Sequence, residues 1–251
     1  TNLCRFLPSV PGYIYAQKQN TIFVNLFITS VTKVNLNAKT SVELSQQTNY
    51  PWDGNVKIAI NPSKKTKLAV YIRIPGWIRN LPVPGNLYSY INPTSETVVV
   101  KLNGKITEYK TENGYAVIDR EWKKGDVIDY ILPLNIHRVE TNSNVKANKN
   151  KVALERGPIV YCMEGVDNIN MFGNMILPDD AELSANFDKN RLNGVGVITG
   201  EGITFKSSAD GLSVQSLNQP FIAIPYYSWC NRGITQMQVW VPRKVSHVDI
   251  E

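Results

Sequence analysis

The chain has 251 residues, of which 43% are hydrophobic and 19% are charged, a composition typical of globular proteins and unlike that of disordered ones. It carries 27 Lys and Arg against 21 Asp and Glu, a formal net charge of +6. Its apolar runs are far shorter than the roughly 18 to 20 residues of a membrane span, so we expect no membrane partner.

The positive charge is dispersed along the chain. Its densest groups are SKKTK (63–67), WKKG (122–125) and KANKNK (146–151), each beside turn-forming residues. No helical basic stripe and no nucleic-acid motif accompanies them. We interpret these groups as solvated turns and expect no nucleic-acid partner.

The first 20 residues differ in pattern from the rest of the chain. They begin without Met or a signal peptide, and Pro8 and Pro11 would interrupt any short helix. We interpret residues 1–20 as the tail of an element that starts upstream. From Thr21 the sequence changes to IFVNLFIT (22–29), which is rich in aromatic and β-branched residues and predicts a buried strand.

Alternating apolar residues then recur at short spacing. Residues 68–74 place Leu68, Val70, Ile72 and Ile74 on one side, as a core-facing strand requires. Asn103-Gly104 lies between two such runs and predicts a tight hairpin. Further strands are predicted at residues 30–37, 41–48, 56–60, 97–102, 115–119 and 127–132.

A polar, Asn-rich segment between residues 133 and 149 indicates a domain boundary. Beyond it, Gly157-Pro158 is expected to form a tight bend after Glu155-Arg156, whose role we interpret as architectural. Regular short strands with frequent turns favour a β-sandwich or barrel. The predicted strands of this half are residues 151–162, broken by Gly157-Pro158, and residues 183–187, 195–199, 203–206, 212–215, 221–224, 236–241 and 245–250.

Catalytic or metal-binding chemistry has few candidate residues. Hydrolysis by paired carboxylates needs two facing groups, and acidic residues in β-rich loops are usually surface groups, so we assign no catalytic residue. No serine-hydrolase elbow, zinc-protease helix or phosphate loop is present. The candidate carboxylates are Glu155, Glu164, Asp167, Asp179 and Asp180.

Cysteine and histidine are also scarce. Cys4, Cys162 and Cys230 form no CxxC pair, so neither a disulfide framework nor a metal knuckle is encoded. Cys162 and Cys230 are expected to be small buried hydrophobes in strands. His137 and His247 are interpreted as incidental, and we assign no metal ligand.

Aromatic side chains provide the remaining candidate site. Core packing accounts for most of the Trp residues, such as Trp240 in a strand and Trp77 at a strand end. Tyr227 and Trp229, next to Tyr226, are candidate carbohydrate contacts because flat aromatic faces stack on sugars.

Several ordered motifs resemble those of the family-127 glycoside hydrolases of the β-L-arabinofuranosidase type. The resemblance spans nearly the whole chain. Its motifs are RF (5–6), GYIY (12–15), VNLFI (24–28), TNYPWDG (48–54), RIPGW (73–77), ALERGPIVYC (153–162) and AIPYYSWCNRG (223–233).

The resemblance implies a helical (α/α)6 barrel that carries the active site and is followed by β-sandwiches, of which this chain holds the sandwiches alone. The implied fold is all-β, with two consecutive antiparallel β-sandwich (jelly-roll-like) domains at residues 21–138 and 139–251, and residues 1–20 as a remnant of the barrel. The family's zinc-binding cysteine pair, which includes the nucleophile, would precede Thr1, and its glutamates would lie further upstream. Cys4 is not at the pair's position. We therefore expect no cofactor in this chain and zinc in the absent catalytic domain.

One segment departs from the family pattern. Residues 79–96, with Pro82, Pro84 and Pro93, are interpreted as an enlarged loop that leaves the substrate preference open.

These observations allow three hypotheses for function. The first is a non-catalytic accessory region whose partner is the missing catalytic barrel. The alternative is a carbohydrate-binding module for plant-type glycans, with Tyr226, Tyr227 and Trp229 as contacts. The third is a shortened piece that self-associates through its exposed barrel-facing surface. The compartment is open, and is periplasmic or secreted if the parent protein has a signal peptide.

Overall fold

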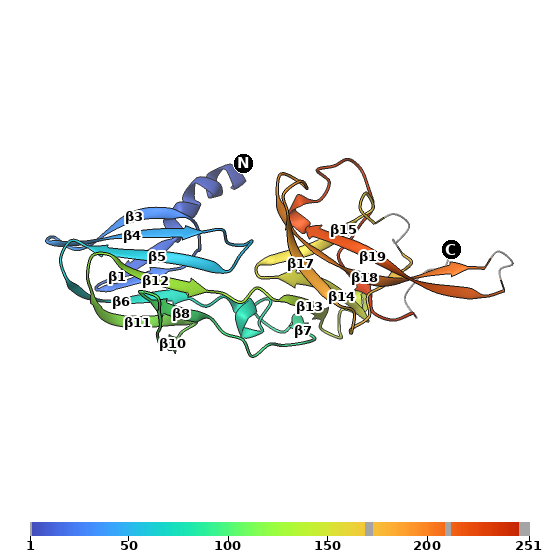
Figure 1. Ribbon diagram of the computed structural model, residues 1–251, viewed down its shortest axis with the longest axis horizontal. Helices are drawn as coiled ribbons and strands as arrows, with labels where there is room; N and C mark the ends of the chain where they lie inside the picture. Colours follow the sequence, from blue (N-terminus) through green and yellow to red (C-terminus); the bar gives the residue numbers. More distant parts are fainter. Residues whose placement is uncertain (1, 169–172, 209–211, 246–251) are drawn as a thin grey trace. The chain divides into compact units, whose positions relative to one another are not determined.

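The computed structural model describes residues 2–168, 173–208 and 212–245 (Figure 1). The chain forms two compact units. Unit 1 contains Thr1–Arg79 and Ser95–Pro133, and unit 2 contains Asn80–Thr94 and Leu134–Glu251.

Unit 1 is a sandwich of two sheets. Tyr130 of one sheet donates its hydroxyl to the Arg73 carbonyl of the other at 3.0 Å, and its ring packs against Phe27 with centroids 5.6 Å apart. The 5-stranded sheet has the order β1 (Tyr15–Lys18), β2 (Thr21–Val24), β6 (Thr66–Arg73), β11 (Tyr115–Trp122) and β10 (Lys110–Glu112). The 6-stranded sheet has the order β3 (Ser30–Asn37), β4 (Thr40–Thr48), β5 (Asn55–Pro62), β12 (Asp126–Ile131), β8 (Val99–Leu102) and β9 (Lys105–Ile106).

The core of unit 1 follows from the alternation in the sequence. Successive side chains of a strand point to opposite faces, so every second residue of β5, β6 and β12 is buried. The strand pairs are antiparallel apart from β2 with β6, which is parallel. The Asn103-Gly104 hairpin is confirmed, since Leu102 pairs with Lys105 and both turn residues have positive φ.

Two details of the N-terminal region differ from the prediction. The predicted strand over residues 22–29 ends at Val24, because the next backbone N–H groups, those of Asn25 and Leu26, donate to the Ile14 carbonyl instead of a ladder. Within residues 1–20, β1 pairs with β2 and belongs to the first sheet. Before it lie α1 (Asn2–Phe6) and the 3-10 helix η1 (Leu7–Tyr13).

Unit 2 is built on one 10-stranded sheet. Its path is β16 (Met175–Ile176), β18 (Val195–Ser207), β19 (Val214–Pro225), β15 (Ile159–Glu164), β14 (Lys151–Arg156), β13 (Ile136–Thr141) and β7 (Tyr88–Tyr90). Off this path, β17 (Leu183–Asp188) pairs with β18, β20 (Met237–Gln238) with β15, and β21 (Val241–Pro242) with β14. The remaining 3-10 turns are η2 (Gly76–Arg79), η3 (Lys146–Asn148) and η4 (Tyr226–Ser228).

The division of the chain differs from the expected one. The segment interpreted as an enlarged loop contributes β7, which pairs with β13 of unit 2. The sequence places the boundary after residue 138, which lies inside β13, whereas the structure divides the chain after Pro133. Ladder hydrogen bonds between β7, β13 and β14 tie these residues to unit 2.

The second half contains longer strands than predicted. The strands expected at residues 195–199 and 203–206 are one strand, β18, and those at 212–215 and 221–224 merge into β19. The strand predicted at 236–241 is two short strands, β20 and β21. The strand predicted at 245–250 lies outside the described residues apart from Val245. The all-β prediction is confirmed: among the described residues, α1 is the single α-helix, and the sheets are antiparallel with one parallel pair.

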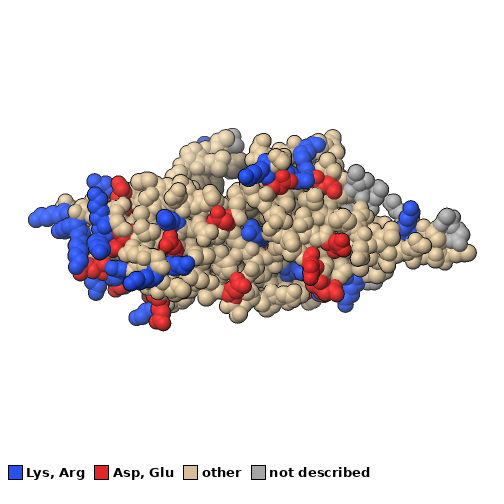
Figure 2. All heavy atoms as spheres, in the orientation of Figure 1, with Lys and Arg blue, Asp and Glu red and all other residues tan. Residues whose placement is uncertain are grey.

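Two of the basic groups, SKKTK (63–67) and WKKG (122–125), lie at the same end of unit 1, where Figure 2 shows Lys and Arg side chains gathered in blue. Gly125 N–H donates to the Asn61 side chain at 2.9 Å, which joins the β11–β12 turn to the β5–β6 turn. Lys64, Lys65 and Lys123 are exposed there, in keeping with their interpretation as solvated turns. In the part of the chain that the structure describes, no helix is long and apolar enough to cross a membrane.

Candidate functional site

The two late sequence motifs come together on neighbouring strands of unit 2. In the β15–β19 ladder, Tyr161 pairs with Pro225 and Cys162 pairs with Ile224. ALERGPIVYC (153–162) therefore lies beside AIPYYSWCNRG (223–233), although about 60 residues separate them in sequence. The candidate site lies where β19 ends, next to β15.

Residues 226–229, which we call the aromatic turn, begin directly after β19. Pro225 ends the strand, and the Trp229 N–H donates to the Tyr226 carbonyl at 3.1 Å to close the 3-10 turn η4. Side chains three residues apart eclipse each other in such a turn. The rings of Tyr226 and Trp229 accordingly lie parallel, 3° between planes and 6.5 Å between centroids.

The aromatic turn exposes three large rings. The exposed fractions are 46% for Tyr226, 65% for Tyr227 and 40% for Trp229, whereas Ser228 is buried at 6%. The Ser228 side chain therefore faces inward, whereas the three aromatic side chains face solvent. The two predicted contact residues, Tyr227 and Trp229, are thus both at the surface.

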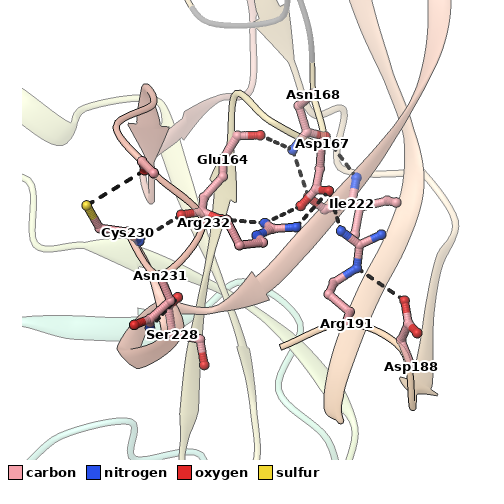
Figure 3. A network of polar contacts seen from close by, with 11 residues as sticks. Glu164, Asp167, Asn168, Asp188, Arg191, Ile222, Ser228, Cys230, Asn231 and Arg232 are labelled. Carbon is pink, nitrogen blue, oxygen red and sulfur yellow. Dashed lines mark hydrogen bonds and ion pairs between the residues drawn. The ribbon is translucent and has the colours of Figure 1, made fainter. Parts of the chain in front are cut away.

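A cluster of charged and amide side chains holds the chain that follows the aromatic turn (Figure 3). We call it the anchor network. Glu164, at the end of β15 and fully buried, accepts a hydrogen bond from the Cys230 N–H at 2.8 Å and forms an ion pair with Arg232. The network consists of Glu164, Asp167, Asn168, Asp188, Arg191 and Arg232.

The rest of the anchor network extends from this pair. Asp167 accepts from Arg232 at 3.0 Å and forms an ion pair with Arg191, which also reaches Asp188 at 3.2 Å. The Asn168 amide donates to the Ile222 carbonyl and accepts from the Ile222 N–H, both at 2.9 Å. These contacts link the end of β15 to β19 and to the chain after the aromatic turn.

Electrostatics explains why these partners occur together. A buried carboxylate is costly unless it is paired and hydrogen-bonded, and Glu164 receives both kinds of contact. The hydrogen bond that Arg232 donates to Asp167, helped by the one it donates to Glu164, raises the pKa of Arg232, so its charge is permanent. Burial, reinforced by the charge of Glu164, raises the pKa of the Cys162 thiol to about 12, which makes this thiol unreactive.

Arg156 lies on the other side of the site, at the end of β14. It pairs with Ile159 of β15, two residues before Tyr161, which pairs with Pro225 at the end of β19. Burial is the largest cause that raises the pKa of Tyr161, while Arg156 opposes the rise. Arg156 and Tyr161 therefore belong to the two strands that follow β19 in the sheet, next to the aromatic turn.

Glu155 contacts a distant tyrosine. It is buried and accepts a hydrogen bond from the Tyr90 hydroxyl at 2.8 Å, so it secures β7 to β14. This contact is architectural, as the sequence interpretation has it, although its partner comes from the segment interpreted as an enlarged loop. Burial raises the pKa of Glu155 to about 7. Gly157 has φ 59°, as the predicted tight bend requires.

The histidine and cysteine predictions have mixed outcomes. His137 is buried and stacks on Tyr90 with centroids 4.1 Å apart, so it is a core residue of unit 2. His247 lies outside the described residues. Cys162 is buried in β15 as expected, but Cys230 is exposed with φ 66° outside any strand, because the anchor network holds its backbone N–H.

Four of the five candidate carboxylates, Glu155, Glu164, Asp167 and Asp179, are committed to structural contacts. Glu164 and Asp167 converge, but Arg232 lies between them and neutralises them. Asp179 forms an ion pair with Arg243, with one contact at 2.6 Å. Asp180 lines a shallow surface groove with Glu182 and Glu201. Among the residues that the structure describes, no group of three His, Cys, Asp or Glu residues could hold a metal ion.

Sequence reasoning missed the two arginines and Asn168. Arg191 and Arg232 lie 24 and 65 residues from Asp167. Such long separations leave no periodic signal, since the contacts exist only after β15, β18 and β19 have paired. A signal was present only in the close succession of Tyr226, Tyr227, Trp229 and Arg232 in one motif.

Comparison with known proteins identifies relatives of both units. Residues 21–134 match the model of the GH127 β-L-arabinofuranosidase middle domain, and residues 136–242 match that of the glycoside hydrolase family 127 C-terminal domain. A non-reducing end β-L-arabinofuranosidase of Bifidobacterium longum subsp. longum is 29% identical over 262 residues, which cover 96% of this chain and 36% of that protein.

Solved structures give the same result. A GH127 β-arabinofuranosidase matches with a TM-score of 0.92 and 34% identity over 99% of this chain and 39% of that chain. A GH127 β-L-arabinofuranosidase from Geobacillus stearothermophilus T6 matches with a TM-score of 0.85 and 37% identity over 97% of this chain and 37% of that chain. The chain thus spans well under half the length of these relatives.

Proposed function

Because this chain belongs to glycoside hydrolase family 127, we propose that it is the non-catalytic accessory region of a β-L-arabinofuranosidase-like enzyme. One observation carries the proposal: the chain matches the family's middle and C-terminal domains from residue 21 to residue 242, while covering only 36% to 39% of relatives named as arabinofuranosidases. The catalytic chemistry is then supplied by a domain outside this chain.

The carboxylates of the chain support this assignment. A glycosidase works with two carboxyl groups that face one glycosidic bond and are free to exchange protons or attack the sugar. Glu164 and Asp167 are both held by Arg232, and Glu155 is buried against Tyr90. These contacts suit structural anchors and not an acid and nucleophile pair.

We place the (α/α)6 barrel and its zinc ion in the domain outside this chain. The described residues do not fit a zinc site, as they assemble no group of ligands for it. When bound in the barrel, zinc would hold and activate the thiolate nucleophile. The role proposed for this chain is mechanical support of that domain.

The N-terminal segment offers a surface for such support. Leu3, Phe6, Leu7 and Tyr13 of α1 and η1 are exposed at 65%, 55%, 58% and 58%. Large apolar side chains exposed within one short segment favour burial against another domain. We propose that the catalytic barrel covers it in the parent enzyme, and self-association of the isolated chain is the competing outcome.

The test replaces Phe6 and Leu7 with Asp in the full parent enzyme and in this chain alone. The double variant should lower, by several degrees, the temperature at which the parent loses its arabinofuranosidase activity. The reason is that burial of each apolar side chain against the barrel contributes about 1.5 to 3 kcal/mol. It should leave the melting temperature of the isolated chain unchanged. Ile106→Asp, at a position 78% exposed in the β8–β9 hairpin, is the control.

If the Phe6 and Leu7 substitutions leave the parent's inactivation temperature unchanged, the barrel does not use this surface. If they instead convert a dimeric isolated chain into a monomer in sedimentation experiments, self-association is the role of the surface. The inactivation temperature of the parent tests contact with the barrel, and the sedimentation of the isolated chain tests self-association.

A further inference from the structure

The aromatic turn combines features that structural support does not require. Tyr226, Tyr227 and Trp229 expose between 40% and 65% of their surface within four consecutive residues. Exposed aromatic groups gathered in one place are uncommon in a solvated surface, and clustered ones mark a binding site. Tyr and Trp suit this use because each joins an apolar face to a polar hydrogen-bonding tip.

The shape of the turn suits a flat ligand face. The planes of Tyr226 and Trp229 differ by 3°, and their centroids lie 6.5 Å apart. Because the rings are parallel, both present the same orientation to an incoming molecule. A sugar ring has a face of C–H groups that packs on aromatic rings and an edge of hydroxyl groups that needs hydrogen-bond partners.

The turn is held before any ligand arrives. Glu164 binds the backbone of Cys230, Arg232 joins Glu164 to Asp167, and Asn231 donates to the Ser228 carbonyl at 3.0 Å. A binding surface that is already ordered loses less conformational entropy on association. The use of a fully buried carboxylate to hold one surface turn is explained if the position of that turn matters.

Polar groups flank the rings at a suitable place. Arg156 ends β14 and pairs with Ile159 of β15, and Tyr161 of β15 pairs with Pro225, the residue directly before the aromatic turn. A guanidinium presents several N–H donors in a fixed plane, which suits the oxygen atoms of a saccharide. The guanidinium donors of Arg156 therefore come from a strand close to the aromatic turn.

We propose that the aromatic turn, flanked by Arg156, is a carbohydrate subsite that binds an arabinofuranosyl unit by stacking on Tyr226 and Trp229, with Tyr227 at its edge. The choice of arabinofuranose rests on the proposed function, whereas the stacking site rests on the geometry alone. The subsite holds glycan chains near the enzyme and takes no part in bond cleavage.

The experiment titrates the intact 251-residue chain with arabinofuranosyl oligosaccharides and follows binding by isothermal calorimetry and Trp fluorescence. Trp229→Ala should weaken binding about tenfold or more, and Tyr227→Ala should weaken it less, since loss of one stacking face removes both dispersion and buried area. Trp229→Phe should recover part of the affinity. Tyr13→Ala removes a tyrosine of unit 1 that is 58% exposed, and it should leave the affinity unchanged.

The melting temperature of each variant shows whether it is folded. Binding that is absent in the wild-type chain, or that Trp229→Ala and Tyr227→Ala leave unchanged, overturns the subsite. Titration with xylan oligosaccharides tests the sugar: equal affinity for both glycans overturns the choice of arabinofuranose. Failure of the subsite is distinguishable from failure of the proposed function, which would show as cleavage of arabinofuranosides by the chain alone.

Discussion

Arg232 is the residue on which the anchor network depends most. It neutralises Glu164, which is fully buried, and Asp167, while its own side chain is 22% exposed. Removal of one member of a buried ion pair leaves an uncompensated charge, which costs more than the pair itself contributes. Arg232 therefore contributes to the stability of the chain as well as to the position of the segment that follows the aromatic turn.

We predict that Arg232→Met destabilises the chain by about 3 kcal/mol, because Glu164 then stays buried without its cation. Urea denaturation monitored by circular dichroism measures the change. Lys65→Met is the matched control: it removes an ion pair with Glu121 at 2.7 Å in which both side chains are more than half exposed, and it should cost less than about 1 kcal/mol. Equal effects of the two substitutions would contradict the anchoring role.

Glu155 makes the stability of unit 2 depend on pH. Its pKa is raised from 4.5 to about 7 by burial, against the opposing effect of the Tyr90 hydrogen bond. Below pH 4.5 the carboxyl is protonated in both folded and unfolded chains. As the pH rises from 4.5 toward 7, the Glu155 carboxyl ionises in the unfolded chain but not in the folded one, so the free energy of unfolding falls. Above pH 7 the carboxyl is ionised in both, and the total loss of unfolding free energy is about 3 kcal/mol.

Glu155→Gln should therefore make the chain more stable than the wild type at about pH 8 but not at about pH 4, on either side of the two pKa values. The amide oxygen keeps an acceptor for the Tyr90 hydroxyl, while the ionisable group is removed. Unfolding free energies at the two pH values provide the measurement, with the exposed Glu108→Gln as the control. A wild type and a Glu155→Gln variant with the same pH dependence would show that Glu155 is not buried as described.

At the residue scale, the sequence predicts the exposure of the aromatic side chains at the candidate site better than it predicts which side chains contact each other. Tyr227 and Trp229 could be selected because they are flat aromatic side chains next to Tyr226, and the structure places both at the surface. The partner of Glu155 could not be found, since Tyr90 lies 65 residues away on a strand whose sequence is typical of a loop. Such contacts depend on sheet order, which a single sequence does not encode locally.

At the element scale, close approach between strands explains the TNYPWDG motif (48–54). A Cβ on Gly54 would lie 1.9 Å from the Leu132 carbonyl oxygen, and the Leu132 N–H donates to the Gly54 carbonyl at 2.9 Å. Glycine is needed here because the backbone that follows β12 passes directly over it.

Gly54→Ala should destabilise unit 1 by about 2 kcal/mol or more, since the contact with backbone atoms cannot relax without breaking the bond to Leu132. Gly12→Ala is the matched control, because a Cβ there meets no atom within 4 Å. Thermal unfolding of both variants measures the difference. An unchanged melting temperature for Gly54→Ala would exclude the close approach.

The sequence predicts strands with clear alternation well and irregular strands poorly. Leu68, Val70 and Ile72 are buried in β6 as the period of two requires. The pattern splits each of β18 and β19 into two strands, because Gly200, Gly202 and Pro220 interrupt it while the ladder continues through them. The ladder hydrogen bonds, which involve the backbone of any residue, outweigh the local signal.

At the scale of the whole molecule, the two units match consecutive domains of one hydrolase family. The all-β fold could be predicted from the short apolar strands and turn residues, whereas the contribution of β7 to unit 2 required the structure. Our central proposal is that this chain supports catalysis performed by another domain.

The most direct test is hydrolysis of p-nitrophenyl β-L-arabinofuranoside by the purified 251-residue chain, beside the full parent enzyme at equal molar concentration. We predict that the parent releases p-nitrophenol and that the chain releases none above the rate of the buffer. Release by the chain at a rate comparable to that of the parent would contradict the proposal, because the carboxylates held by Arg232 and Tyr90 would then have to perform the chemistry.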